Sequence, residues 1–157
     1  MRRLVRSAAV AVFVVGLVTG CGSSKKASSS SDGGVTAAPA ANGAPVAVTA
    51  GDKSDTEQFL TVDPISVKAG PVTFTFKNTG ARQHEMIVLK TDEAFDALTV
   101  GADNKVSEDA SVGEVSETDA GKTVTKTLDL KAGKYVLVCN IEKHYAQGMR
   151  SAFTVTS

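Results

Sequence analysis

A cysteine, a histidine and a methionine lie close together near the end of the chain, between two runs of residues that are typical of β-strands. Cys139, His144 and Met149 follow the apolar residues 135–138 and precede the strand-like residues 152–155. If the two runs are neighbouring strands, the loop between them returns the chain, and both sulfur atoms lie at the same end of a hairpin. The imidazole, midway round the loop, then points back between them. This segment predicts a strand–loop–strand unit that gathers two sulfur groups and one imidazole.

A second imidazole is available from only one other position. The chain has two histidines, and the other one, His84, opens the apolar run 85–89. A thiolate, neutral imidazoles and a weak thioether are the ligands that suit copper in both of its oxidation states. Taken singly, such residues are more often core or surface groups, but here both histidines fall where a metal site needs them. We therefore predict a metal site formed by His84, Cys139, His144 and Met149, and we favour copper because zinc sites use more Cys or His and need no thioether.

Short alternating runs separated by turn residues extend through residues 45–157, a length that fits one domain. The predicted strands are 46–49, 59–62, 65–67, 72–76, 85–89, 122–130, 135–139 and 152–155. This spacing predicts an all-β fold, an antiparallel Greek-key β-sandwich of seven to eight short strands. Alternation also places Met86 on the same face as His84, where we expect it to pack in the core rather than bind metal.

A different pattern interrupts these strands between residues 91 and 119. Residues 91–98 predict a short helix, with Thr91 or Asp92 as its N-cap and with Phe95 and Leu98 on one face. The segment contains one basic residue and nine acids, namely Asp92, Glu93, Asp96, Asp103, Glu108, Asp109, Glu114, Glu117 and Asp119. We interpret it as a helical and acidic insertion. An ordinary solvated surface is the favoured explanation of its charge, and steering of a basic redox partner is the alternative.

The first 20 residues have the features of a lipoprotein signal peptide. Three arginines precede the apolar residues 8–18, a run too short to span a membrane. Residues 18–21, Val-Thr-Gly-Cys, resemble the lipobox at which bacterial lipoproteins are cleaved and lipidated. We therefore predict that Cys21 becomes the lipid-bearing N-terminus of the mature protein, anchored to the outside of the cell membrane without crossing it.

Residues 21–44 are predicted to form the lipid-bearing N-terminus followed by a flexible linker. The linker is rich in Ser, Ala and Gly, and this composition offers too little apolar surface for a core. If Cys21 carries lipid, Cys139 is the only remaining thiol, since the chain has two cysteines. Thiols outside the cytoplasm are prone to oxidation or pairing. A bound metal would protect Cys139, which supports the metal site independently of the spacing.

The spacing Cys-x4-His-x4-Met, with an upstream histidine that opens a strand, resembles the cupredoxins, the small blue copper proteins such as plastocyanin and azurin. The likeness covers the predicted globular domain and is greatest for single-domain, membrane-anchored bacterial members. It implies one mononuclear type 1 copper, with His84, Cys139 and His144 as equatorial ligands and Met149 as the long axial ligand. Residues 142–143 are Glu-Lys, where many relatives have Pro-Gly.

The same resemblance implies how the site would work. His144 would be the ligand at the solvent edge, and Tyr145 and Ala146 would belong to the docking surface for partners. We expect Cys139 to accept backbone N–H hydrogen bonds that raise the reduction potential. The implied function is a monomeric, membrane-anchored, extracytoplasmic carrier of single electrons between redox proteins of respiratory or oxidase type.

Two other functions stay open. The same ligands would serve copper storage or delivery to an oxidase, and a metal-free adhesion or scaffold sandwich would not use them at all. Nucleic-acid binding is not indicated, because the net charge is zero and no basic stripe or aromatic platform occurs. The chain also has no Ser/His/Asp set and no phosphate-binding loop, and both histidines are assigned to metal. We therefore do not expect an enzyme.

Overall fold

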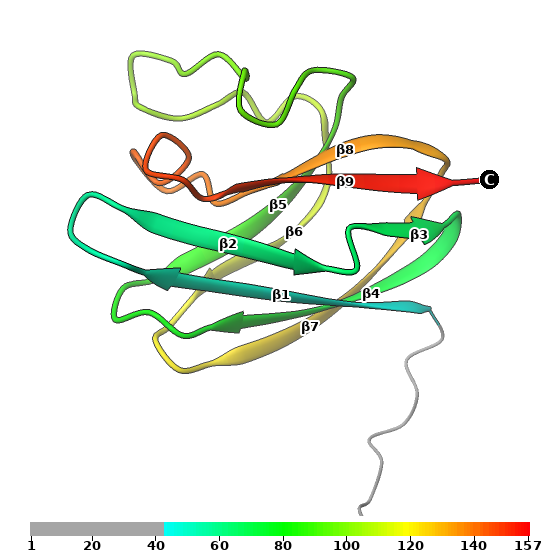
Figure 1. The fold of residues 1–157 in the computed structure, drawn as a ribbon, viewed down its shortest axis with the longest axis horizontal. Helices are drawn as coiled ribbons and strands as arrows, with labels where there is room; N and C mark the ends of the chain where they lie inside the picture. Colours follow the sequence, from blue (N-terminus) through cyan, green and yellow to red (C-terminus); the bar gives the residue numbers. More distant parts are fainter. Residues whose placement is uncertain (1–42) are drawn as a thin grey trace, which may run out of the picture. The chain divides into compact units, whose positions relative to one another are not determined.

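The computed structural model describes residues 43–157, which form two β-sheets (Figure 1). The first sheet has the strand order β2-β1-β4-β7, with β1 Ala44–Asp52, β2 Gln58–Asp63, β4 Gly70–Asn78 and β7 Thr123–Leu130. The second has the order β3-β9-β8-β5-β6, with β3 Ser66–Lys68, β5 His84–Lys90, β6 Ser111–Thr118, β8 Gly133–Val138 and β9 Arg150–Thr156. The predicted β-sandwich is therefore confirmed.

The sheets differ from the prediction in strand number and direction. Nine strands occur within the described residues, and two pairs, β1 with β4 and β3 with β9, are parallel. The chain crosses to the second sheet at β3 between β2 and β4, so that β4 returns to the first sheet in the same direction as β1. The missed strand, β6, lies inside the predicted insertion. It pairs with β5 at the sheet edge and buries only Val115 and Thr118, so its apolar alternation is weak.

The predicted helix at residues 91–98 is wrong, because no helix occurs in the part of the chain that the structure describes. The backbone groups that a helix would pair internally are bonded to a side chain instead. The hydroxyl of Tyr145 accepts a hydrogen bond from Leu98 N–H at 3.0 Å and donates one to Phe95 C=O at 2.9 Å. Residues 91–110 consequently form an irregular segment. Figure 1 shows it, in yellow-green, beside the loop that precedes β9.

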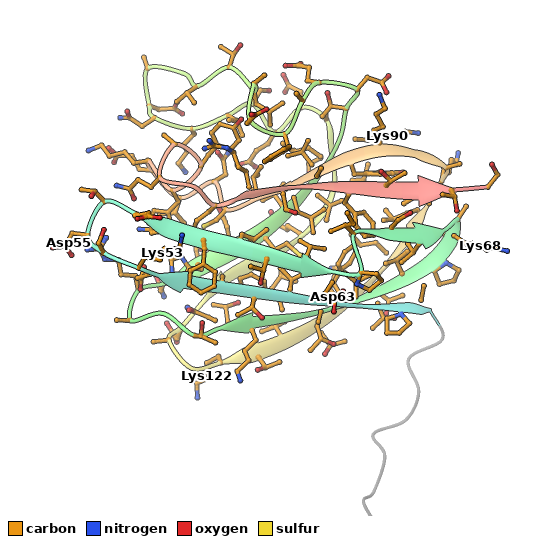
Figure 2. The ribbon with its side chains drawn as sticks, in the orientation of Figure 1. Lys53, Asp55, Asp63, Lys68, Lys90 and Lys122 are labelled. Atoms are coloured by element: carbon orange, nitrogen blue, oxygen red, sulfur yellow. The ribbon has the colours of Figure 1, made fainter. Side chains whose placement is uncertain are left out.

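Buried side chains form two clusters, one on each face of the second sheet. The main core lies between the sheets and includes Phe74, Phe76 and Phe153. The smaller cluster lies on the other face and contains Ile87, Leu89, Val106, Val136, Val138 and Tyr145. Charged side chains such as Lys53 and Lys68 point away from the sandwich (Figure 2).

Strands β5 and β8 are buried on both faces, because successive residues face opposite clusters. In β8, Tyr135 and Leu137 enter the main core, whereas Val136 and Val138 enter the smaller cluster. In β5, Met86 is fully buried in the main core, as the alternation predicts. These two strands form a firmly packed platform at whose ends His84 and Cys139 lie.

The predictions for the N-terminal region fall outside the described residues. They are the signal peptide at 1–20, lipidation of Cys21 and the linker as far as residue 42. Within residues 43–157, no helix is long and apolar enough to cross a membrane.

Candidate metal centre

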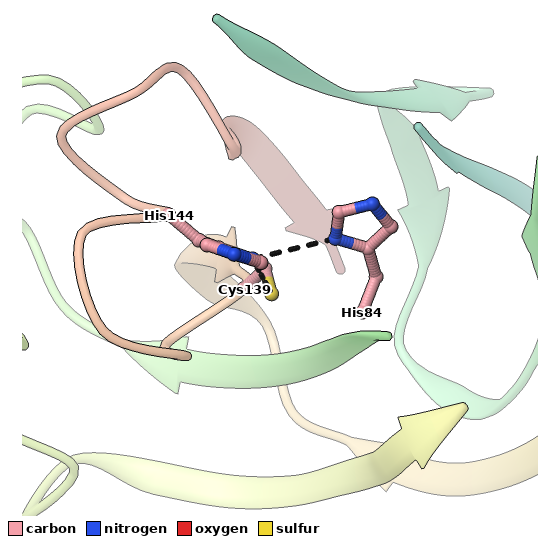
Figure 3. A group of neighbouring side chains, drawn as sticks. All are labelled: His84, Cys139 and His144. Atoms are coloured by element: carbon pink, nitrogen blue, oxygen red, sulfur yellow. Dashed lines mark hydrogen bonds between the residues drawn. The ribbon is translucent and has the colours of Figure 1, made fainter. Parts of the chain in front are cut away.

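Three of the four predicted ligands converge at one end of the sandwich (Figure 3). His84 is the first residue of β5, Cys139 directly follows β8, and His144 lies on the loop between β8 and β9. One donor atom from each residue lies within 4.8 Å of the others. The Nδ1 atom of His144 is 3.3 Å from the Nδ1 atom of His84 and 3.3 Å from the Sγ atom of Cys139. Two imidazoles and one thiol therefore point at a common centre.

Met149, the fourth predicted ligand, is held beside Cys139 by the backbone. Cys139 N–H donates to Met149 C=O at 3.1 Å, which extends the pairing of β8 with β9 by one step. Met149 N–H donates in turn to His144 C=O at 3.0 Å. Met149 is fully buried in the same core cluster as Cys139. The two sulfur residues thus lie at the same end of a hairpin, as the spacing predicts.

The site is closed to solvent on every side but one. His84, Cys139 and Met149 have no exposed surface, whereas 7% of His144 is exposed. A metal held here would approach the outside of the protein along His144. This asymmetry agrees with the expectation that His144 lies at the solvent edge.

Burial shifts the pKa values of the two histidines and of the cysteine in opposite directions. It lowers the pKa of His144 to about 4, with a further contribution from the neighbouring His84, and it lowers the pKa of His84 against the opposing effect of Asp52. Both imidazoles are therefore neutral near pH 7 and can offer a lone pair. Burial raises the pKa of the Cys139 thiol to about 11. Metal binding at this thiol must release a proton, and a cation at the sulfur provides the driving force.

A backbone N–H group already points at the cysteine sulfur. Glu85 N–H donates to Cys139 Sγ at 3.4 Å. A backbone hydrogen bond to the cysteine sulfur, as expected, is therefore present, and it comes from the residue that follows His84. The side chain of Glu85 reaches the same region, because its Oε1 atom accepts a hydrogen bond from Asn140 N–H at 3.0 Å.

Asp52, at the end of β1, is a neighbour of the site that the sequence did not indicate. Its Oδ1 atom lies 3.1 Å from Nε2 of His84, whereas the other ring nitrogen, Nδ1, faces His144. Its Oδ2 atom accepts hydrogen bonds from Ala81 N–H at 2.7 Å and Arg82 N–H at 3.2 Å. Burial raises the pKa of Asp52, but these two backbone hydrogen bonds and the positive charge of the nearby Arg82 outweigh that effect and lower the pKa overall. The carboxylate is therefore ionised near pH 7.

The segment 91–110 fastens the loop that carries His144. Lys143 N–H donates to Asn104 C=O at 3.0 Å. The Asn140 side chain accepts a hydrogen bond from Val106 N–H at 2.8 Å and donates to Val106 C=O at 2.9 Å. The segment 91–110 belongs to the stretch that the sequence predicts to be an acidic insertion. The structure shows that its backbone also supports the loop that carries His144.

The two residues predicted for a docking surface, Tyr145 and Ala146, differ in their exposure to solvent. Tyr145 is 3% exposed, with its ring in the smaller core cluster, and the guanidinium of Arg150 stands 5.1 Å from the ring centre. Ala146 is exposed. A docking role stays a prediction for this part of the surface. Because its ring is buried, Tyr145 would support such a surface from inside the protein rather than contact a partner.

These residues fit a type 1 copper ion. Two neutral imidazole nitrogens, one thiol and a neighbouring thioether are the donor set of such sites. Donor atoms 3.3 Å apart have the separation expected around a metal with bonds of about 2 Å. A β-sandwich with this donor set defines the class of protein, a blue copper protein with one mononuclear type 1 site.

The comparison with known families agrees. The model of the copper binding proteins of the plastocyanin/azurin family matches residues 46–156. The chain therefore belongs to this family, the cupredoxins, and its cofactor is copper. No curated protein sequence shows a significant match to the chain.

Solved structures support the fold. Reduced auracyanin from the photosynthetic bacterium Roseiflexus castenholzii is 25% identical, with a TM-score of 0.52, and the match covers 73% of this chain and 100% of that one. Rusticyanin from Thiobacillus ferrooxidans is 22% identical, with a TM-score of 0.56 and coverage of 73% and 79%. An azurin from Methylomonas sp. strain J is 19% identical, with a TM-score of 0.52 and coverage of 73% and 98%. The last two similarities concern the fold alone.

Proposed function

We propose that this protein carries single electrons through one copper ion, which His84, Cys139 and His144 would hold, with Met149 as a weaker fourth donor. The observation that carries this proposal is the convergence of two imidazoles and a thiol in a pocket that the fold closes. When bound, copper supplies the one-electron couple. The proposal describes a carrier, not an enzyme.

The surroundings suit electron transfer because they leave the donor atoms little freedom to move. His84 and Cys139 lie at the ends of strands that are buried on both faces, and the loop between Cys139 and Met149 is closed by its own hydrogen bonds. A site that keeps one geometry in both oxidation states needs little rearrangement when an electron moves. The exposed edge of His144 is the shortest way out of the pocket, so electrons would enter and leave there.

The cellular setting of the proposal rests on the sequence. The predicted signal peptide and lipid-bearing Cys21 would put the protein outside the cytoplasmic membrane, anchored by lipid. There it would act as a monomer between redox proteins of respiratory or oxidase type. The acidic residues of the segment 91–110 would favour a partner with a basic surface.

A cupric titration of the purified full-length protein tests the proposal. We expect one copper per chain, an intense visible absorption band from the thiolate–copper bond, and repeated reduction and oxidation without loss of metal to a chelator. A colourless protein that binds no copper would overturn it.

Copper storage or delivery to an oxidase is the alternative. That function needs ready release of the metal, and the burial of three of the four ligands opposes it. Loss of copper to a chelator upon reduction would favour delivery over electron transfer.

A further inference from the structure

Buried polar atoms without a full hydrogen bond gather behind His84. Within residues 43–157 these side-chain atoms are Oδ1 of Asp52, Nε2 of His84 and both amide atoms of Gln58. Asp52 and Gln58 are direct partners in the pairing of β1 with β2, so their side chains share one face. Gln58 is 2% exposed. Two of these atoms, Oδ1 of Asp52 and Nε2 of His84, face each other at 3.1 Å and have no other hydrogen-bond partner. Buried polar atoms that lack a good partner cost stability, so each one beside a metal site calls for an explanation.

The Asp52 carboxylate is fixed in place by the turn before β5. Its Oδ2 atom receives the N–H groups of Ala81 and Arg82. The backbone at Gly80 comes so close that a Cβ atom there would collide with the Asp52 carboxylate and lie 2.9 Å from Nε2 of His84. One oxygen of the carboxylate is thus held by the backbone, and the other, Oδ1, remains free to face the imidazole at 3.1 Å.

A histidine can bind a metal through Nδ1 only if its proton is on Nε2. The Nδ1 atom of His84 faces His144, and Nε2 faces Asp52. A carboxylate can only accept a hydrogen bond, so the Asp52 oxygen favours the proton on Nε2 and leaves the Nδ1 lone pair directed at the metal centre. None of the ion pairs in the described part of the chain joins a carboxylate to His144, so the two histidines differ in this respect.

We propose that Asp52 is a positioning residue of the copper site: it fixes the tautomer and orientation of His84 and, by its negative charge, stabilises the cupric state. This inference rests on the proposed function for its metal, but its first test does not need copper. Carboxylates that accept a hydrogen bond from a metal-binding histidine raise the basicity of that ligand. Added electron density on His84 favours Cu(II) over Cu(I) and lowers the reduction potential.

The first test is the tautomer of His84 in the metal-free, full-length protein, measured from the ring ¹⁵N chemical shifts. We expect the proton on Nε2. A proton on Nδ1 in the wild-type protein would overturn the proposal, and this measurement needs no variant that might misfold.

The second test uses Asp52→Asn. The amide must turn its oxygen toward Ala81 N–H and Arg82 N–H, and then its NH₂ group faces His84 Nε2. The proton of His84 is thereby driven to Nδ1, as happens when a catalytic Asp–His pair is changed to Asn–His. We expect the ¹⁵N shifts to report this change and the cupric affinity to fall about 10- to 100-fold. Each tenfold loss of cupric over cuprous affinity raises the potential by about 59 mV.

The matched control is Asp55→Asn. It removes the same charge three residues further along, from an exposed side chain that pairs with Arg82. We expect the control to keep the His84 tautomer and the cupric affinity of the wild-type protein. Equal effects of the two variants would reduce the role of Asp52 to a general charge effect and overturn the proposal. Absence of the thiolate–copper band in the wild type would instead refute the proposed function and leave the tautomer result standing.

Discussion

The two sides of the copper site are built in different ways. His84 is on a strand that is buried on both faces, and it is backed by the Asp52 carboxylate. The ligand loop, residues 139–149, lacks such strand packing around His144 and is tied down by hydrogen bonds to the segment 91–110. Packing of the sandwich fixes the first side. Polar contacts with a segment outside the sandwich fix the second, so changes in that segment should alter the site without touching a ligand.

The largest effect should come from Cys139, where the two sides meet. Cys139→Ser removes the thiolate, and we expect the visible absorption band to disappear at every copper concentration, because the band requires a sulfur–copper bond. Absorption spectroscopy during a cupric titration checks this. Met86→Leu is the control, since Met86 is a fully buried sulfur residue in the same core and should keep the band. A blue Cys139→Ser variant would contradict the assignment of the ligands.

Replacing each histidine by glycine separates the two sides. The cavity left by His144→Gly should open to solvent, because 7% of His144 is exposed, whereas His84 is enclosed completely. Added imidazole should therefore restore the visible band in His144→Gly and leave His84→Gly without one. Spectra recorded during an imidazole titration measure the difference. Equal rescue of both variants would show that the strand side is as open as the loop side.

A smaller change tests whether the segment 91–110 supports the loop. Tyr145→Phe removes the hydroxyl that bonds Leu98 N–H and Phe95 C=O. We expect the free energy of unfolding to fall by about 1–3 kcal/mol and the amide of Leu98 to exchange its hydrogen faster. The visible band should remain, with faster release of copper to a chelator.

The control for this variant is Tyr135→Phe. Its hydroxyl donates to Lys131 C=O at 2.7 Å, near the start of β8 and outside the ligand loop. It should cost stability without changing the rate of copper release. If both variants release copper at the wild-type rate, the segment 91–110 does not control the loop.

The sequence allowed prediction of the ligands because three of them share one short loop and the chain has only one other histidine. Clear apolar alternation likewise predicted strands such as β4. Asp52 could not be predicted, since its place beside His84 depends on the turn before β5 and on strand pairing between distant residues. The helix prediction at 91–98 failed for a related reason, because a hydroxyl 47 positions away from Leu98 takes the backbone groups that the helix would use.

The smallest expected effect concerns backbone strain, which, among the residues that the structure describes, is found on the loop side of the copper site and not on the strand side. Within residues 43–157, the two non-glycine residues with positive φ are Lys143 at 71° and Asn104 at 61°, and their backbones are hydrogen-bonded to each other on the loop side. A lysine in this conformation costs about 1–2 kcal/mol, whereas asparagine tolerates it better.

Lys143→Gly should relieve that strain, and the greater freedom of glycine in the unfolded chain offsets about 0.5–1 kcal/mol of the gain. Asn104→Gly relieves less strain and meets the same offset. We therefore expect the free energy of unfolding of the metal-free protein, from chemical denaturation, to be about 0.5–1 kcal/mol higher for Lys143→Gly than for Asn104→Gly. The reverse order would mean that the Lys143 side chain stabilises the loop by more than its backbone strain costs, and strain would no longer distinguish the loop side from the strand side.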